Sequence, residues 1–150
     1  MILFSPITRI SLIQVLITLA SIYNLFIHQM DVKTAFLNGD LEEEIYMLQP
    51  EGCIVPGQKN KVCKLKRSLY GLKQAPKQWH EKFDQVVLSD GFSLDSVDKC
   101  VYTKSINNGY VIISLYVDNM LVFGTNMNVV YSTKHFLASK FYMKDWVKLV

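Results

Sequence analysis

Two isolated aspartates stand out because each follows a largely apolar run of residues. Asp31 ends the run 25–30, and Asp118 lies in the tetrapeptide Tyr116–Asn119, directly after the run 111–115. Two carboxylates at the ends of two strands are a common way to hold divalent ions for phosphoryl transfer. The sequence therefore predicts that Asp31 and Asp118 meet in space and form a metal site.

Strands must carry these acids to one place. The apolar pattern predicts a strand over 25–32 and a hairpin of strands 101–104 and 110–117, because Asn107-Asn108-Gly109 between them is a strong turn signal. We expect a second tight turn at Asp118-Asn119, since both residue types tolerate a positive φ. This turn would place Asp118 at the tip of a hairpin.

The remaining elements surround these strands. Helices are expected over 8–23, where Ser5-Pro6 is typical of a helix start, over 76–88 and over 129–141. Short strands at 44–47 and 61–66 flank a loop at 49–58 that is rich in Pro and Gly. Because helices and strands alternate irregularly, we expect the α+β class and a single domain over 1–150.

The composition limits the classes of protein. The chain has 150 residues, of which 50% are hydrophobic and 12% aromatic, so it has enough apolar material for one core and is not a disordered chain. Three cysteines without a C-x-x-C pair indicate neither a disulfide framework nor a zinc site, which favours a reducing compartment.

Segment 10–27 carries no charge, which is also a property of membrane spans and signal peptides. However, polar residues recur there at helical spacing and form a stripe: Ser11, Gln14, Thr18 and Ser21. We therefore expect a core helix with this stripe at its exposed edge and with Leu12, Ile13, Leu16, Leu19, Ala20 and Tyr23 on the buried face. A membrane-anchored protein is the alternative.

A basic stretch runs from Lys59 to Lys82, with eight Lys or Arg residues and one acid. Interleaved Tyr70 and Trp79 add rings, and cations combined with rings suit the phosphates and bases of a nucleic acid. A solvated, lysine-rich face and core aromatic residues are the alternative. The residues assigned to nucleic-acid binding are Lys64, Lys66, Arg67 and Lys77.

Three segments resemble motifs of copia-type retrotransposon reverse transcriptases. Gln29–Gly39 resembles the first catalytic motif, Ser68–Pro76 the template- and nucleotide-contacting motif, and Tyr116–Met120 the second catalytic motif, which ordinarily begins Tyr-Val-Asp-Asp. The motifs occur in the family's order, and the resemblance covers nearly the whole chain. It implies a polymerase palm-type antiparallel sheet with packed helices, partial fingers and no thumb, as a truncated fragment of a longer polymerase.

The resemblance also implies roles for single residues. The implied catalytic residues are Asp31, Asp118 and Asn119, and the implied ligands of two Mg²⁺ (or Mn²⁺) ions are Asp31, the Val32 carbonyl and Asp118. The implied nucleotide-binding residues are Phe36, Tyr70, Gly71 and Lys73, with the Phe36 ring excluding a 2′-hydroxyl. The implied partners are an RNA/DNA primer–template and deoxynucleotide triphosphates. The implied location is intracellular, cytoplasmic or nuclear, without a signal peptide or transmembrane helix.

Asn119 departs from the family motif, in which the position is an aspartate. An amide offers one neutral oxygen where a carboxylate offers two charged ones, so we expect weaker metal binding. Two functions are therefore open: RNA-directed DNA synthesis with impaired activity, and nucleic-acid binding without catalysis. The sequence indicates no oligomeric state.

Overall fold

A six-stranded sheet forms the centre of the molecule, in the computed structural model that describes residues 7–149 and the side chains of residues 7–144. Its strand order is β4-β5-β6-β7-β1-β8, and every neighbouring pair is antiparallel. The strands are β1 (Phe26–Val32), β4 (Ser93–Leu94), β5 (Val101–Ile106), β6 (Gly109–Tyr116), β7 (Asn119–Gly124) and β8 (Met143–Leu149). With three helices beside this sheet, the expected α+β class is confirmed.

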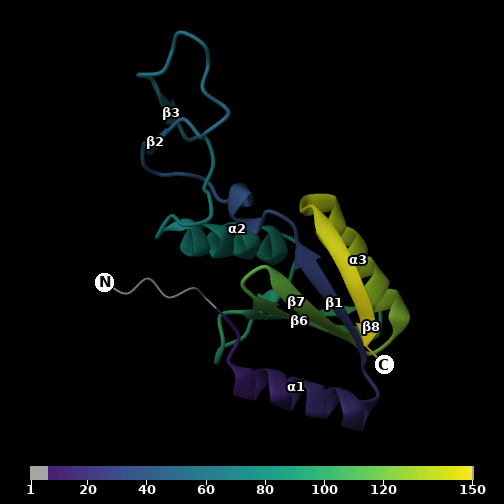
Figure 1. Cartoon of the computed structure of the whole chain (residues 1–150). Helices are drawn as coiled ribbons and strands as arrows, with labels where there is room; N and C mark the ends of the chain where they lie inside the picture. Colours follow the sequence, from purple (N-terminus) through teal and green to yellow (C-terminus); the bar gives the residue numbers. More distant parts are fainter. Residues whose placement is uncertain (1–6, 150) are drawn as a thin grey trace.

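Helices cover both faces of the sheet (Figure 1). The helices are α1 (Ile10–Tyr23), α2 (Ala75–Ser89) and α3 (Met127–Lys140). Side chains of a strand alternate between the two faces, so Met30 and Val32 of β1 join the larger core with α2 and α3. Ile27 of β1 packs on the opposite face with Leu16 of α1. The sheet is therefore the middle of three layers.

Aromatic rings fill the core between α2 and the sheet. Phe83 is fully buried, and its ring lies 5.7 Å from the Trp79 ring, 5.4 Å from the Tyr102 ring and 5.7 Å from the Phe141 ring, measured between centroids. Buried aromatic pairs at such distances add stability beyond the area that they bury. This cluster fixes α2 firmly against the sheet.

Helix α1 ends as the sequence predicts, at Asn24, whose φ of 55° is typical of a left-handed helix cap. The polar stripe is exposed as expected. The predicted buried face is only partly correct, because Leu19 and Tyr23 are exposed while Leu16 and Ala20 are buried. The Ser5-Pro6 start lies outside the described residues. Within residues 7–149, no helix is long and apolar enough to cross a membrane.

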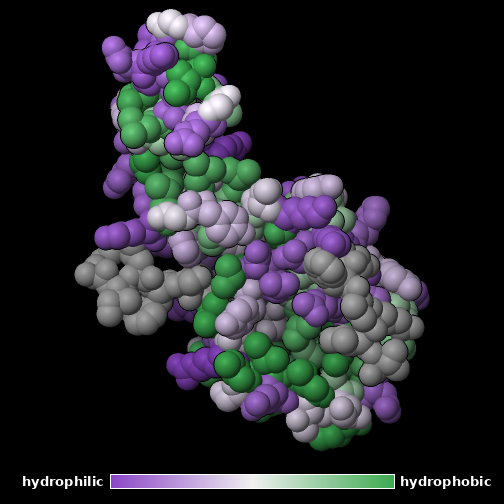
Figure 2. Space-filling model, in the orientation of Figure 1, coloured by the Kyte–Doolittle hydropathy of each residue, from purple (hydrophilic) through white to green (hydrophobic). Residues whose placement is uncertain are grey.

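A narrow arm projects from the three-layered body (Figure 1). It consists of β2 (Tyr46–Leu48), β3 (Val62–Lys64), which pair antiparallel, and the loop between them. The predicted short strands are therefore confirmed, although each has only three residues. Figure 2 shows hydrophilic and hydrophobic residues mixed over this arm, and none of residues 41–67 is buried, so the arm has no core of its own.

The 3₁₀-helix η1 (Ala35–Asn38) and a left-handed Thr34, with a φ of 49°, connect β1 to the arm.

The predicted turn at Asn107-Asn108 is confirmed, with φ values of 43° and 64°. The predicted turn at Asp118-Asn119 is wrong by one residue. Asn119 already pairs with Tyr116 in the sheet, so Val117 and Asp118 form the turn.

Candidate active site

The structure brings Asp31 and Asp118 together. Asp31 is the antiparallel partner of Asn119, the residue that follows Asp118. Partners in such a pair have Cα atoms about 5.5 Å apart at most, and consecutive Cα atoms are about 3.8 Å apart, so the Cα atoms of Asp31 and Asp118 lie within about 9 Å. The two acids predicted to meet are neighbours at one end of the sheet.

The residues around Asp118 hold its position. Its backbone carbonyl accepts a hydrogen bond of 2.8 Å from the backbone N–H of Val32, at the end of β1. Its side-chain oxygen Oδ1 accepts a bond of 3.2 Å from Nδ2 of Asn119. Directly opposite residues of an antiparallel pair point to the same face, so Asp31 and Asn119 face the same side. Three polar side chains therefore gather beside the hairpin tip.

Tyr70 covers this group from the segment between β3 and α2. Its hydroxyl donates a hydrogen bond of 3.2 Å to Oδ2 of Asp118, and its ring lies 4.3 Å from the Phe36 ring. Partial burial raises the pKa of the Tyr70 phenol, and the negative charges of Asp118 and then Asp31 raise this pKa further. Both acids therefore lie close enough to influence the same hydroxyl.

We expect the Asp118→Asn variant to lower the pKa of Tyr70 while leaving it above the ordinary tyrosine value, because burial is the larger cause of the shift. A raised pKa in the folded state means that stability from this group is present below pH about 10 and is lost as the pH rises through the folded-state value. The ¹³Cζ resonance of Tyr70, followed against pH in both proteins, measures this. Identical pKa values would contradict the contact.

Trp79 is a site residue that the sequence did not assign. It is 1% exposed, so it is a core residue and its ring does not stack on a nucleic acid. Its indole Nε1–H donates a hydrogen bond of 2.7 Å to the Val117 carbonyl at the hairpin tip. Tyr70, by contrast, is 59% exposed. The sequence offered Trp79 only as a ring in the basic stretch, stacking or core, and as a residue in the first turns of the helix that follows Ser68–Pro76.

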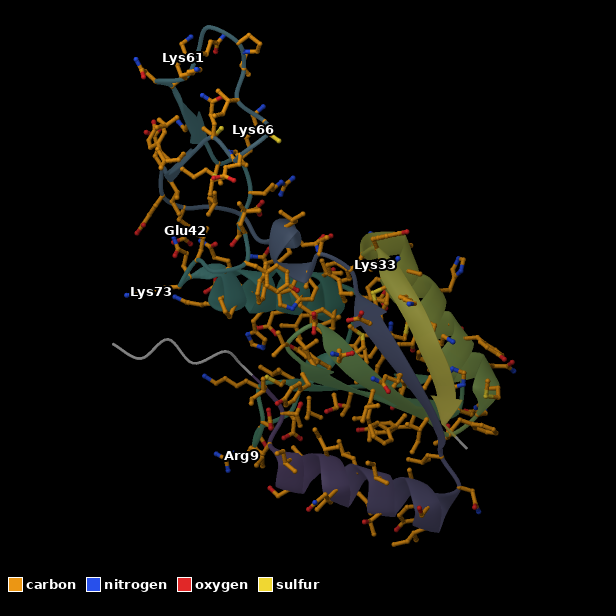
Figure 3. All side chains as sticks on the ribbon, viewed as in Figure 1. Arg9, Lys33, Glu42, Lys61, Lys66 and Lys73 are labelled. Atoms are coloured by element: carbon orange, nitrogen blue, oxygen red, sulfur yellow. The ribbon has the colours of Figure 1, made fainter. Side chains whose placement is uncertain are left out.

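The other predicted nucleotide-binding residues, Phe36, Gly71 and Lys73, differ in their burial. Phe36 is 7% exposed and belongs to η1. Gly71 has a φ of 91°, which suits glycine, and a Cβ there would meet no atom within 4 Å. Lys73 is exposed and points outward near the start of α2 (Figure 3). The Phe36 ring contacts the ring of Tyr70, whose hydroxyl is bonded to Asp118.

Three of the four predicted nucleic-acid-binding cations have acidic partners within the chain. Lys64 pairs with Glu44 and lowers the pKa of that carboxyl, while Arg67 lies 2.8 Å from Asp40. Lys77 lies 3.7 Å from Glu81. Lys66 is exposed two residues after the end of β3 (Figure 3). Exposed ion pairs contribute little stability, so a phosphate can exchange with these carboxylates.

The donor atoms suit Mg²⁺ by type. Mg²⁺ prefers hard oxygens and takes only a few of them from protein, and Asp31, Asp118, the Val32 carbonyl and the Asn119 amide are such donors. Among the described residues, no group of three His, Cys, Asp or Glu side chains is arranged to hold a metal. This agrees with the presence of only two of these carboxylates and one amide at the hairpin.

Comparisons with known proteins identify the family. The family model described as reverse transcriptase (RNA-dependent DNA polymerase) matches residues 2–150. The chain is 49% identical over 144 residues to the retrovirus-related Pol polyprotein from transposon TNT 1-94 of Nicotiana tabacum, covering 95% of this chain and 11% of that protein. It is 34% identical over 146 residues to the retrovirus-related Pol polyprotein from transposon RE1 of Arabidopsis thaliana, covering 97% and 10%.

A yeast relative extends the similarity. The chain is 34% identical over 113 residues to the transposon Ty1-DR4 Gag-Pol polyprotein of Saccharomyces cerevisiae, covering 75% of this chain and 7% of that protein. No solved structure matches the chain. The chain spans about a tenth of the length of the two plant polyproteins. It belongs to the reverse transcriptase (RNA-dependent DNA polymerase) family, among the Pol polyproteins of copia-type retrotransposons.

Proposed function

We propose that this chain forms the palm and part of the fingers of a retrotransposon reverse transcriptase, and that its site serves RNA-directed DNA synthesis. The observation that carries this proposal is the pairing of Asp31 with Asn119, which places Asp31 beside Asp118. The substrates would be deoxynucleotide triphosphates and a primer–template.

In this proposal, Asp31 at the end of β1 and Asp118 in the neighbouring turn would hold two Mg²⁺ ions, and the Val32 carbonyl would add a ligand. Such ions, when bound, neutralise the triphosphate and make a primer 3′-hydroxyl a better nucleophile. The Tyr70 hydroxyl donates to Oδ2 of Asp118, and the remaining lone pairs of that carboxylate would be free to bind an ion.

The residues beside the acids would position the nucleotide. The rings of Phe36 and Tyr70, in contact at an interplanar angle of 50°, form an apolar floor next to Asp118 on which a sugar and base can rest. Lys73, exposed near the start of α2, supplies a positive charge for a phosphate. Gly71 leaves open space for a ligand to approach the backbone.

The test is extension of a DNA primer on an RNA template, with Mg²⁺ or Mn²⁺. We expect metal-dependent extension that the Asp118→Asn variant abolishes. Glu51→Gln is the matched control, because it removes a carboxylate from the exposed loop of the arm. Absence of synthesis together with salt-sensitive binding of the primer–template would instead establish the non-catalytic function, which the exposed lysines Lys61 and Lys66 favour.

A further prediction concerns the choice of sugar. Phe36→Val should raise the ratio of ribonucleotide to deoxyribonucleotide incorporation severalfold, because a smaller side chain leaves room for a 2′-hydroxyl. The ring is 7% exposed, so the same change should cost about 1–3 kcal/mol of stability. Incorporation efficiencies for both nucleotides give the ratio. Equal losses of both, with an unchanged ratio, would show that Phe36 serves the core alone.

A further inference from the structure

The turn that carries Asp118 has an unusual backbone. Val117 has a φ of 56°, in the left-handed region. A β-branched residue rarely adopts this conformation, because its side chain collides with the neighbouring backbone, and it persists only where surrounding contacts enforce it. Contacts that hold Val117 in this conformation therefore determine where Asp118 lies.

Two hydrogen bonds hold the two carbonyls of this turn. The Val117 carbonyl accepts from Nε1 of Trp79, on α2, at 2.7 Å. The Asp118 carbonyl accepts from the backbone N–H of Val32, on β1, at 2.8 Å. The second bond links the turn to the strand of Asp31. The first comes from a separate layer of the molecule.

The Trp79 donor has little freedom to move. The side chain is 1% exposed, and its ring lies 5.7 Å from the Phe83 ring and 5.2 Å from the Phe141 ring. A buried indole N–H also needs an acceptor, since leaving it unsatisfied is costly. The indole and the carbonyl therefore satisfy each other at a fixed position.

We propose that Trp79 is a positioning residue for the metal site: its indole N–H holds the Val117 carbonyl and thereby keeps the strained turn that presents Asp118 to Asp31. The identity of the site as a metal site rests on the proposed function, whereas the effect of Trp79 on the hairpin does not. The Trp79 indole bonds the Val117 carbonyl, so it acts on Asp118 through Val117.

The strain at Val117 provides a specific test of this role. Without the indole N–H, valine should return to a negative φ, and Asp118 should move relative to Asp31. Glycine adopts a positive φ without steric cost, so Val117→Gly should compensate for the loss of the indole N–H. A purely structural role for the Trp79 ring predicts no such rescue.

The experiment uses the whole 150-residue chain. Mn²⁺ binding is titrated by electron paramagnetic resonance. Trp79→Phe should weaken it about tenfold, in line with the loss of one buried hydrogen bond. Trp79→Phe combined with Val117→Gly should return within about threefold of the unaltered chain. Phe83→Leu, which disturbs the same ring cluster without removing a hydrogen bond, should change Mn²⁺ affinity less than twofold.

A measurement without metal separates the proposed role of Trp79 from the proposed metal site. It uses the unaltered chain, so it does not depend on the folding of a variant. In the unaltered chain, NMR should detect a through-hydrogen-bond coupling between Nε1 of Trp79 and the carbonyl carbon of Val117. Its absence would overturn the role of Trp79. A coupling in a chain that binds no Mn²⁺ would support the hydrogen bond and refute the metal site. Where Mn²⁺ does bind, an equal loss of affinity in Trp79→Phe and Phe83→Leu, without rescue by Val117→Gly, would overturn the inference.

Discussion

Replacement of Asn119 by aspartate is expected to tighten Mg²⁺ binding by about tenfold to a hundredfold. Asn119 is the strand partner of Asp31 and donates to Asp118, so a carboxylate there would face the same ions. A unit negative charge about 4 Å from a divalent ion is attracted by roughly 8 kcal/mol at an effective dielectric constant of 20. Desolvation and repulsion among three carboxylates cancel most of this, and the remainder is the expected gain.

Isothermal titration with Mg²⁺ at constant ionic strength measures the gain. Asn128→Asp is the matched control: it makes the same chemical change on the exposed side of α3, beyond the opposite end of β7, and should alter affinity less than twofold. In the absence of Mg²⁺, Asn119→Asp should also lower stability, because like charges crowd the hairpin. Equal affinities of both forms would show that position 119 does not reach the ions.

The second large effect concerns stability. Phe83→Ala should lower the free energy of unfolding by about 3–5 kcal/mol, the range typical of a fully buried phenylalanine. Three rings, those of Trp79, Tyr102 and Phe141, lose a partner at once. A domain of this kind has only about 5–15 kcal/mol to lose.

Urea denaturation followed by circular dichroism provides the measurement. Tyr23→Ala is the control, because that aromatic side chain is 69% exposed and should change stability by less than about 0.5 kcal/mol. A loss below about 1 kcal/mol for Phe83→Ala would mean that the ring cluster rearranges to fill the space, and that α2 is held to the sheet by other contacts.

The elements that the sequence predicted well are those with strong local signals. The Asn107-Asn108 turn has two residues that tolerate a positive φ, and the structure shows both in that conformation. Pro76 lies in the first turn of α2, as a helix-starting proline should. Asp31 and Asp118 were predicted to be neighbours because Gln29–Gly39 and Tyr116–Met120 resemble family motifs. The strand register confirms that they are.

The errors arose where distant contacts override local preference. Asp118-Asn119 has the better turn chemistry, yet the turn is at Val117-Asp118, because Trp79 and Val32 hold the carbonyls of that alternative. Neither donor is near the turn in sequence. Similarly, the polar stripe of α1 predicts its exposed edge, but apolar residues continue on both sides of that stripe, so the helix sequence does not determine which of them are buried.

The arm should open locally more easily than the rest of the molecule. A two-stranded ribbon without a core is marginally stable in water, and the arm pairs only three residues of β2 with three of β3, with residues 51–62 exposed. Such a unit opens with a free energy far below that of global unfolding. A protease should therefore nick the loop at 51–60 while the sheet stays folded, and backbone amides of the arm should exchange with deuterium before those of β1, β6 and β7. Three lysines of the basic stretch, Lys59, Lys61 and Lys64, lie on this weakly held arm, so an anion that bound them would also order it.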